Sequence, residues 1–543
     1  MGTFEEVEDG NNCAVCKKPA ESKCKGCKEV NYCTRNCQKT HWKRHKNECK
    51  LLPYKVEKSA ELGRFLVATR DIKKGDAIFK EAPLVLGPVA QTLPVCLACY
   101  ELVDGTYKCK KSGWPLCGPQ CEAKVAHNPE VVIPSQTEGL FEIESYEEPC
   151  YLYECVTPLR ALLLQKTAPK RFKKIMSLES HLESRKGTEA WQTCQDRVID
   201  VMKKTLGVMV FEVLYPQLDF KDERIQELVG IFETNSIEIR LGQTEVHGLY
   251  EMGSMMEHSC VPNINMSFDE KFHLTATAGR DIEKGEHLSI MYTHCLWGTW
   301  ARRDHLINYK KFWCSCKRCS DPSELGTEFS TILRNGKKLR PKNPLEPNTS
   351  WVSTDGTNEV SSIDVQNDMT RIAAELSILQ IKGTVPEFRE FLEKYSKELH
   401  PCHYHMVAAK HNLLQMLGRV EGFVIQDMPM KDLKEKEHLC RELVELCKKL
   451  DPSVCRLQIY LGVSLYELHF PLLQYGKRAW ESGDMSTEEF RKSLMEPRDL
   501  LIETASVLRD ETNTKLPEGQ LRMQVRETLT QLEGFMKTVG CDF

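Results

Sequence analysis

The residues with the clearest chemistry are cysteines, and the first group of them lies between residues 13 and 49. It pairs potential metal ligands at short spacings: Cys13 with Cys16, Cys24 with Cys27, Cys33 with Cys37, and His45 with Cys49. A CxxC turn places two thiolates on one face of a tetrahedral ion, and two such pairs complete a closed structural site. The ligand pairs therefore predict two zinc ions. The alternative, a set of reduced surface cysteines, fits this spacing poorly.

Another cysteine group, near residue 316, is a tight loop with too few ligands of its own. Cys314, Cys316 and Cys319 offer three thiolates, whereas a closed zinc site needs a fourth ligand. The best candidate is Cys260, which is distant in the sequence. We therefore expect one zinc ion that joins two remote segments of the chain.

The first group resembles the MYND zinc finger along its whole length. In that family the ligand pairs interleave. The resemblance therefore implies that one ion is held by Cys13, Cys16, Cys33 and Cys37, and the other by Cys24, Cys27, His45 and Cys49.

The cysteines between residues 96 and 131 look like a half-lost copy of the same finger. The resemblance implies one zinc ion, held by Cys96, Cys99, Cys117 and Cys121. Of the second ligand set only Cys109 and His127 remain, because Ser112 and Val131 stand where thiolates belong. A cysteine-rich loop without metal is the alternative.

The distant pairing of Cys260 with the loop at 314–319 is typical of a SET domain with a post-SET zinc loop. Here the chain resembles the SMYD family of SET- and MYND-domain protein-lysine methyltransferases. Four segments carry the resemblance: residues 63–68, Asn235-Ser236 with residues 248–250, residues 258–263, and residues 284–292. The additional N-terminal finger resembles the arthropod-type branch of that family. Each motif alone is weak, but their order together with the zinc pairing predicts a SET fold.

The resemblance implies methyl transfer from S-adenosylmethionine (SAM) to a lysine amine of a histone or another protein. Tyr292 would be the catalytic residue that orients the lysine nitrogen. Asn235 would contact the polar end of the cofactor, backbone groups around His258 would hold its adenine, and Phe312 would stack on that ring. The remaining residues implied at the cofactor are Gly63, Arg64, Phe65 and Glu257.

Two of these residues depart from the family pattern. Glu257 stands where the family has Asn, and its carboxylate would repel the carboxylate of the cofactor. Phe65 stands where many members have a small Gly, so its ring would narrow the pocket. A second hypothesis follows, in which the chain is a catalytically inactive SET-fold scaffold. Its MYND finger would dock proline-containing peptides and its helical C-terminal domain would bind partner proteins, whereas the retained Tyr292 favours the enzyme.

The elements that position these residues follow from periodicity and composition. They predict an α+β fold with these parts: a zinc-stabilised MYND finger over 11–50, a SET domain over 54–295 with a degenerate MYND-like insert at 96–131 and a helical insert at 150–235, a post-SET zinc loop over 296–320, a polar linker over 321–365, and an all-helical domain over 366–543. Amphipathic blocks near 402–417, 431–450, 455–473, 486–507 and 519–538 resemble the TPR-like domain of the SMYD family. Leu413, Leu414, Leu443 and Leu446 are its core candidates.

Composition bounds the class of protein. At 543 residues the chain is too long for one hydrophobic core. The formal net charge of −4 does not favour direct binding to nucleic acid. The chain contains no run of eighteen apolar residues, so we expect no membrane span. The first ten residues are acidic and carry no apolar export signal, so we expect metal-binding cysteines and a location in the cytoplasm and/or nucleus.

Overall fold

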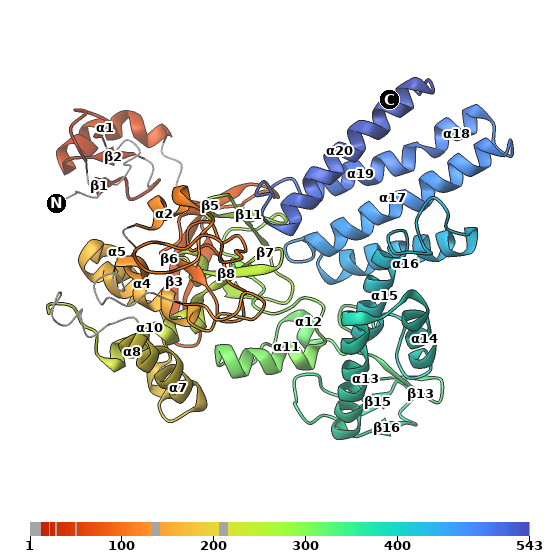
Figure 1. The fold of residues 1–543 in the computed structure, drawn as a ribbon, viewed down its shortest axis with the longest axis horizontal. Helices are drawn as coiled ribbons and strands as arrows, with labels where there is room; N and C mark the ends of the chain where they lie inside the picture. Colours follow the sequence, from red (N-terminus) through yellow and green to blue (C-terminus); the bar gives the residue numbers. More distant parts are fainter. Residues whose placement is uncertain are drawn as a thin grey trace.

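The computed structural model describes residues 12–20, 22–27, 30–48, 52–126, 128–132, 142–205 and 216–541. Cys49 and His127, which the sequence assigned to zinc ligand sets, lie outside the described residues. Figure 1 shows three parts in chain order: a small N-terminal finger, a body of short strands flanked by helices, and a long array of helices that ends at the C-terminus.

The N-terminal finger has little secondary structure. Strands β1 (Ser22–Lys23) and β2 (Asn31–Tyr32) pair antiparallel, and helix α1 (Arg35–Glu48) follows. Its buried side chains are few and are mostly cysteines: Cys13, Ala20, Cys24, Cys27 and Tyr32. So small an apolar core cannot stabilise a fold alone, and metal coordination must supply the rest.

The body contains four small sheets. The hairpin of β3 (Tyr54–Ser59) and β4 (Gly63–Ala68) turns at Gly63, whose φ of +67° favours glycine. The next two sheets have the orders β10 (Ile264–Phe268), β11 (Leu274–Ala278), β5 (Ala77–Glu81) and β6 (Val85–Pro88), β8 (Thr244–Leu249), β7 (Ile237–Leu241). A parallel pair, β9 (Glu257–His258) with β12 (Ser289–Ile290), lies beside the motif residues.

Short helices cover the sheets and fill the predicted helical insert. They are α2 (Pro119–Val125), α3 (Pro129–Val132), α4 (Tyr153–Thr167), α5 (Pro169–Ile175), α6 (Leu182–Arg185), α7 (Glu189–Cys194), the π-helical turn Gln195–Ile199, α8 (Asp200–Thr205) and α10 (Asp222–Asn235). Helix α4 packs on β6 and α10 packs on α4, so the insert and the sheets share one apolar core. Cys150 and Cys155 are buried in that core.

The region after the body differs from the prediction in one part. Helix α11 (Thr299–His305), the π-helical turn Leu306–Lys310 and α12 (Lys317–Ser320) surround the cysteine loop. The predicted linker over 321–365 is wrong, because it contains a four-stranded antiparallel sheet: β13 (Ile332–Arg334), β14 (Lys337–Pro341), β15 (Trp351–Ser353) and β16 (Glu359–Val360). Leu339 and Phe329 pack this segment against the C-terminal helices. The strands are short and polar, so their pattern in the sequence does not predict this packing.

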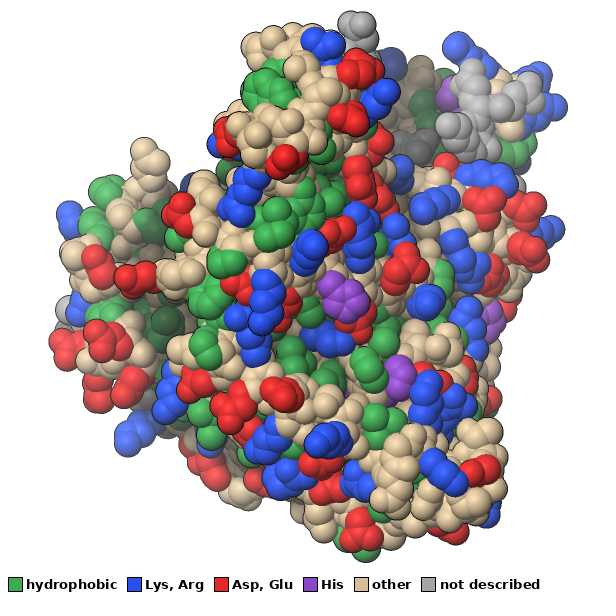
Figure 2. All heavy atoms as spheres, turned by 90° about the vertical axis from the view of Figure 1, so that its right-hand side faces the viewer, with side chains coloured by type: hydrophobic (Ala, Val, Ile, Leu, Met, Phe, Trp, Pro, Cys, Tyr) green, Lys and Arg blue, Asp and Glu red, His purple; other side chains and the backbone are tan. Residues whose placement is uncertain are grey.

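The C-terminal part is helical, as predicted. It comprises α13 (Ser362–Lys382), α14 (Val385–Tyr395), α15 (Tyr404–Met416), α16 (Met430–Leu450), α17 (Gln458–Glu481), α18 (Thr487–Ser493), α19 (Met495–Val507) and α20 (Pro517–Thr538). The four predicted core leucines are at most 4% exposed. Within the described residues, no helix combines the length and apolarity needed to cross a bilayer. On the face drawn in Figure 2, Lys and Arg side chains are interspersed with Asp and Glu.

One buried ion pair joins three helices of this array. The Lys436 ammonium donates to the Glu467 carboxylate at 2.6 Å and to the carbonyls of Leu414 and Leu417. Both side chains are at most 1% exposed, and Arg419 also pairs with Glu467. Without Lys436, the buried Glu467 carboxylate would keep, among the described residues, only the exposed Arg419 guanidinium as a charged partner, so most of its compensation would be lost.

The change Lys436→Met is therefore expected to lower the free energy of unfolding by about 3 kcal/mol. Urea denaturation followed by far-UV circular dichroism measures this loss. Lys434→Met on the exposed face of the same helix is the control and should change stability little. Equal stabilities for the two variants would contradict the role assigned to the pair.

Candidate functional site

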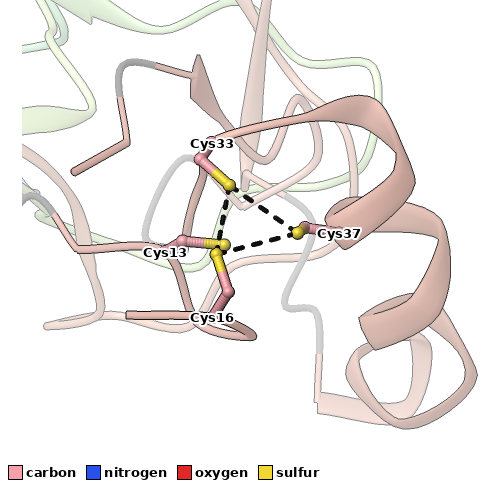
Figure 3. Close-up of side chains that lie close together, drawn as sticks. All are labelled: Cys13, Cys16, Cys33 and Cys37. Carbon is pink, nitrogen blue, oxygen red and sulfur yellow. Dashed lines mark hydrogen bonds between the residues drawn. The ribbon is translucent and has the colours of Figure 1, made fainter. Parts of the chain in front are cut away.

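The N-terminal finger brings its first predicted ligand set together. The sulfurs of Cys13, Cys16, Cys33 and Cys37 all lie within 4.8 Å of one another and converge on one point (Figure 3). Cys16 and Cys33 are 3.2 Å apart and Cys33 and Cys37 are 3.6 Å apart. A tetrahedral zinc ion with Zn–S bonds of about 2.3 Å separates its sulfurs by about 3.8 Å. These four residues fit a zinc site.

The second ligand set of the finger is also assembled as far as it is described. Cys24, Cys27 and His45 lie together, with the His45 Nε2 atom 3.4 Å from the Cys27 sulfur. All three side chains are buried. They fit three of the four ligands of a second zinc ion, and Cys49 would be the fourth.

The cysteines between residues 96 and 131 bring one complete set of four zinc ligands together. The sulfurs of Cys96, Cys99, Cys117 and Cys121 lie within 4.8 Å of one another. Ser112 and Val131 are fully buried, so these positions have become part of the core. The arrangement fits one zinc ion.

The remote pairing expected for the last group is present. Cys260, Cys314, Cys316 and Cys319 form a fourth cluster, with Cys260 and Cys319 sulfurs 3.5 Å apart. The fully buried Arg302 donates to the Cys260 sulfur at 3.3 Å and to the Cys319 sulfur at 3.7 Å. A zinc ion with four thiolates carries a net negative charge, and a buried guanidinium beside it compensates that charge.

His258 links this cluster to Tyr292. Its Nδ1 accepts the backbone N–H of Tyr292 at 3.0 Å, while its Nε2 lies 3.3 Å from the Cys260 sulfur. An imidazole with its proton on Nε2 satisfies both contacts, because it then donates to the thiolate and accepts from the amide. The cluster of four cysteines, acting through His258, therefore sets the position of the residues after β12, where Tyr292 lies.

Tyr292 stands at a wall of a cavity of about 1110 Å³. Its hydroxyl donates to the carbonyl oxygen of Met256. Burial, with the Glu257 carboxylate nearby, raises the pKa of Tyr292 above its usual value, so the phenol stays protonated at neutral pH. A protonated hydroxyl tied to a carbonyl keeps its oxygen lone pairs available to accept a hydrogen bond from an incoming amine.

The backbone of His258 offers an unpaired edge beside Tyr292. In the parallel pair with β12, the neighbouring amides of Glu257 and Ser259 donate to that strand, at 3.1 and 2.9 Å. The N–H and C=O of His258 therefore point the other way, and nothing among the described residues pairs with them. Phe312 lies beside the same residue, with ring centroids 5.9 Å apart. One donor, one acceptor and a flanking ring fit the edge and face of an adenine.

Asn235 and Arg64 frame the segment 177–181 from two sides. The Arg64 guanidinium donates to the carbonyl of Ser177, and the Asn235 amide donates to the carbonyl of Glu179 at 2.8 Å. The Oδ1 atom of Asn235 has no partner among the described residues, so it can accept from an ammonium group. Gly63 contributes a turn: its α-carbon is exposed and its conformation alone explains the glycine.

The two departures from the family pattern touch each other through a third residue. The Glu257 carboxylate pairs with His287 at 2.5 Å, and the His287 ring lies against Phe65 with centroids 4.7 Å apart. A protonated His287 would compensate the charge of Glu257. His287 was not predicted from the sequence as part of the site. Its position between Glu286 and Leu288 indicates only a residue of a strand and does not indicate a contact with Glu257.

Lys310 is a second residue that the sequence did not reveal. Its ammonium lies 5.8 Å from the centre of the Tyr292 ring and donates to the carbonyls of Glu233 and Thr234 at 3.0 and 2.7 Å. Burial lowers the pKa of Lys310 to about 8. The positive charge of Lys310 would repel a protonated amine beside Tyr292. Lys310 therefore favours the neutral form of an amine that approaches Tyr292.

Buried histidines line the far wall of the cavity. His294 contacts Tyr460 of α17 through a hydrogen bond of 3.0 Å, and the Tyr460 ring lies against His411 of α15. Burial lowers the pKa of both histidines to about 4. These neutral rings join the strand-rich body to the C-terminal helices.

Comparison with known proteins matches two family models, the MYND finger at residues 13–49 and the SET domain at residues 63–293. SET domain-containing protein SmydA-8, isoform A, of Drosophila melanogaster is 24% identical over 423 residues, covering 74% of this chain and 86% of that protein. Histone-lysine N-methyltransferase ASHR1 of Arabidopsis thaliana is 22% identical over 481 residues, covering 82% and 90%. Human histone-lysine N-methyltransferase SMYD3 is 26% identical over 288 residues, covering 49% and 62%.

The buried histidines predict acid sensitivity of the folded state. Between pH about 6.5 and about 4, the unfolded chain binds protons that the folded chain does not, so the free energy of unfolding falls as the pH decreases through this window. Urea denaturation at a series of pH values should show this fall and a shallower one in His411→Gln. His438→Gln is the control, because that side chain is 79% exposed. The same pH slope in native protein and His411→Gln would count against the assignment.

Proposed function

Because the chain belongs to the SMYD family of SET- and MYND-domain proteins, in its arthropod-type branch with an additional N-terminal finger, we propose that it is a protein-lysine N-methyltransferase. The proposed methyl donor is SAM, and the proposed substrate is a lysine of a histone or another protein. One observation carries the proposal: Tyr292 lines a deep cavity directly beside the unpaired backbone edge of His258. The names of two relatives, histone-lysine N-methyltransferases, support the reaction class.

SAM would supply an electrophilic methyl group when bound. His258 would hold the adenine edge with its N–H and C=O, and Phe312 would cover the ring. Asn235 would accept from the ammonium of the cofactor through Oδ1, and Arg64, which donates to the carbonyl of Ser177, would pair with the carboxylate of the cofactor. These residues bind and orient, and most of the rate enhancement comes from that alignment.

Tyr292 would orient the substrate amine. Its hydroxyl is fixed by Met256, so it accepts a hydrogen bond from the lysine nitrogen and leaves the nitrogen lone pair free. A lysine has a reference pKa near 10.4 and must lose a proton first. Lys310, held by the carbonyls at the end of α10, disfavours a second positive charge at this point.

The change Tyr292→Phe is expected to lower kcat by about a hundredfold or more, because it removes the hydroxyl proposed to orient the amine, while leaving the affinity for SAM unchanged. Methyl transfer from labelled SAM to protein substrates measures the first effect, and titration calorimetry the second. Tyr309→Phe, an exposed ring near the cavity mouth, is the control. Full activity of the Tyr292 variant would contradict the catalytic role assigned to Tyr292.

The proposed zinc content is four ions: two in the N-terminal finger, one at residues 96–121 and one in the post-SET cluster. Purified protein should contain about four zinc atoms per chain by plasma mass spectrometry. Cys117→Ser should lower the content by one. Cys109→Ser should not, because that sulfur lies outside the four clusters assembled among the described residues. A loss of zinc in the Cys109 variant would show that the insert uses a different ligand set.

A second candidate is a catalytically inactive scaffold, which the Glu257 carboxylate and the bulky Phe65 ring, both beside His287, favour. In this role the MYND finger would dock proline-containing peptides, and the C-terminal helices would bind partner proteins. Calorimetry with SAM separates the two: binding in the micromolar range supports the enzyme, and its absence supports the scaffold. We propose a location in the cytoplasm and/or nucleus, with no role for membranes or direct nucleic-acid binding.

A further inference from the structure

Glu511 lies in the loop between α19 and α20, where the C-terminal helices meet the body. The neighbouring Asn513 donates to the carbonyl of Asp269, at the tip of the β10–β11 hairpin, which holds this loop against the sheet. Glu511 is only 5% exposed, and its side chain lines the same cavity as Tyr292. The residues that line this cavity also include the apolar side chains of Phe268, Leu516 and Leu521.

The carboxylate of Glu511 has no hydrogen-bond or ion-pair partner among the described residues. Six other carboxylates among the described residues are also buried, at most 9% exposed, and each has a partner: Glu130, Glu324, Glu328, Asp432, Asp451 and Glu467. Burial, together with the carboxylates of Glu518 and Asp510, raises the pKa of Glu511 to about 8. An unpaired buried carboxyl destabilises the fold, and such groups concentrate at binding sites.

Glu518 adds a second acidic group at this end of the cavity. It lines the cavity in the first turn of α20 and forms no ion pair among the described residues. The cations that line the rest of the cavity lie elsewhere and mostly have partners: Arg240 pairs with Glu238, Arg419 with Glu467, and Lys310 with the end of α10. Arg456 is exposed. This end of the cavity therefore carries two carboxyl groups that have no ion-pair partner among the described residues, and the charge of Arg522 on α20 lowers the pKa of Glu511 only in part.

We propose that Glu511, together with Glu518, forms a subsite for a second basic side chain of the protein substrate, a lysine or arginine near the methylated lysine in the chain. This assignment rests on the proposed lysine methyl transfer, since the peptide that presents its lysine at Tyr292 must occupy this cavity. A guanidinium or ammonium group at Glu511 forms the ion pair that Glu511 lacks. This contact offsets the free energy that is lost by burying an unpaired carboxyl. The enzyme thereby selects basic segments rather than isolated lysines.

Peptides with a single lysine test the subsite. In one series an arginine occupies each flanking position in turn, and in the matched series citrulline replaces the arginine, which keeps the shape and removes the charge. At one or two positions, arginine should raise kcat/KM by about tenfold or more over citrulline. Glu511→Gln should reduce this ratio to near one while retaining activity on the citrulline peptides. Glu503→Gln is the matched control: it removes a carboxylate of the adjoining helix α19 that pairs with Lys448 and does not line the cavity.

An unchanged arginine preference in Glu511→Gln, or no preference in native protein, would overturn the subsite. Peptide affinity, measured by fluorescence anisotropy without SAM, separates its failure from that of the methyl transfer. If no peptide is methylated but arginine still strengthens binding through Glu511, the subsite stands and the enzyme does not. Calorimetry with CaCl₂ gives a further outcome: calcium binding that depends on Glu511 would assign the acidic pair to a metal ion instead.

Discussion

The cluster of four thiolates that joins Cys260 to the loop at 314–319 is the interaction on which the rest of the site depends. It ties a strand end in the centre of the body to a loop more than fifty residues later in the chain. Both segments have little regular structure of their own: β9, before Cys260, is two residues long, and the loop contains only the four-residue helix α12. Metal coordination supplies a fixed tetrahedral geometry that hydrophobic contacts do not.

The cluster also requires a charge balance that reaches into the C-terminal region. Arg302 compensates the thiolates and pairs with Glu324 at 2.8 Å, and Glu324 in turn pairs with Arg318 at 2.9 Å. All three are at most 1% exposed. Burial of this network is possible only because the sheet β13–β16 and the C-terminal helices cover it. The helical region therefore stabilises the metal site as well as closing the cavity.

Sequence alone predicted the parts of the site that depend on short spacing or on motif order. The ligands of the finger follow from CxxC spacing, and Cys260 follows from a loop with one ligand too few. The helices of the C-terminal part follow from apolar periodicity. By contrast, Lys310 and Arg302 matter because of what surrounds them in space, and a single basic residue in a helix carries no such signal. The strands β13–β16 were missed because turn residues outnumber apolar ones there.

The two residues that depart from the family pattern cannot be judged one at a time. Glu257 and Phe65 both contact His287, so replacing Glu257 by Asn removes a repulsive charge but also removes the charged partner of His287. Residues in such contact have non-additive effects on binding. The informative comparison is therefore a double-mutant cycle on Glu257 and His287. If the pair exists to compensate the carboxylate, the double variant should bind SAM more tightly than the sum of the single changes implies. If Glu257 alone obstructs the cofactor, the two effects should simply add.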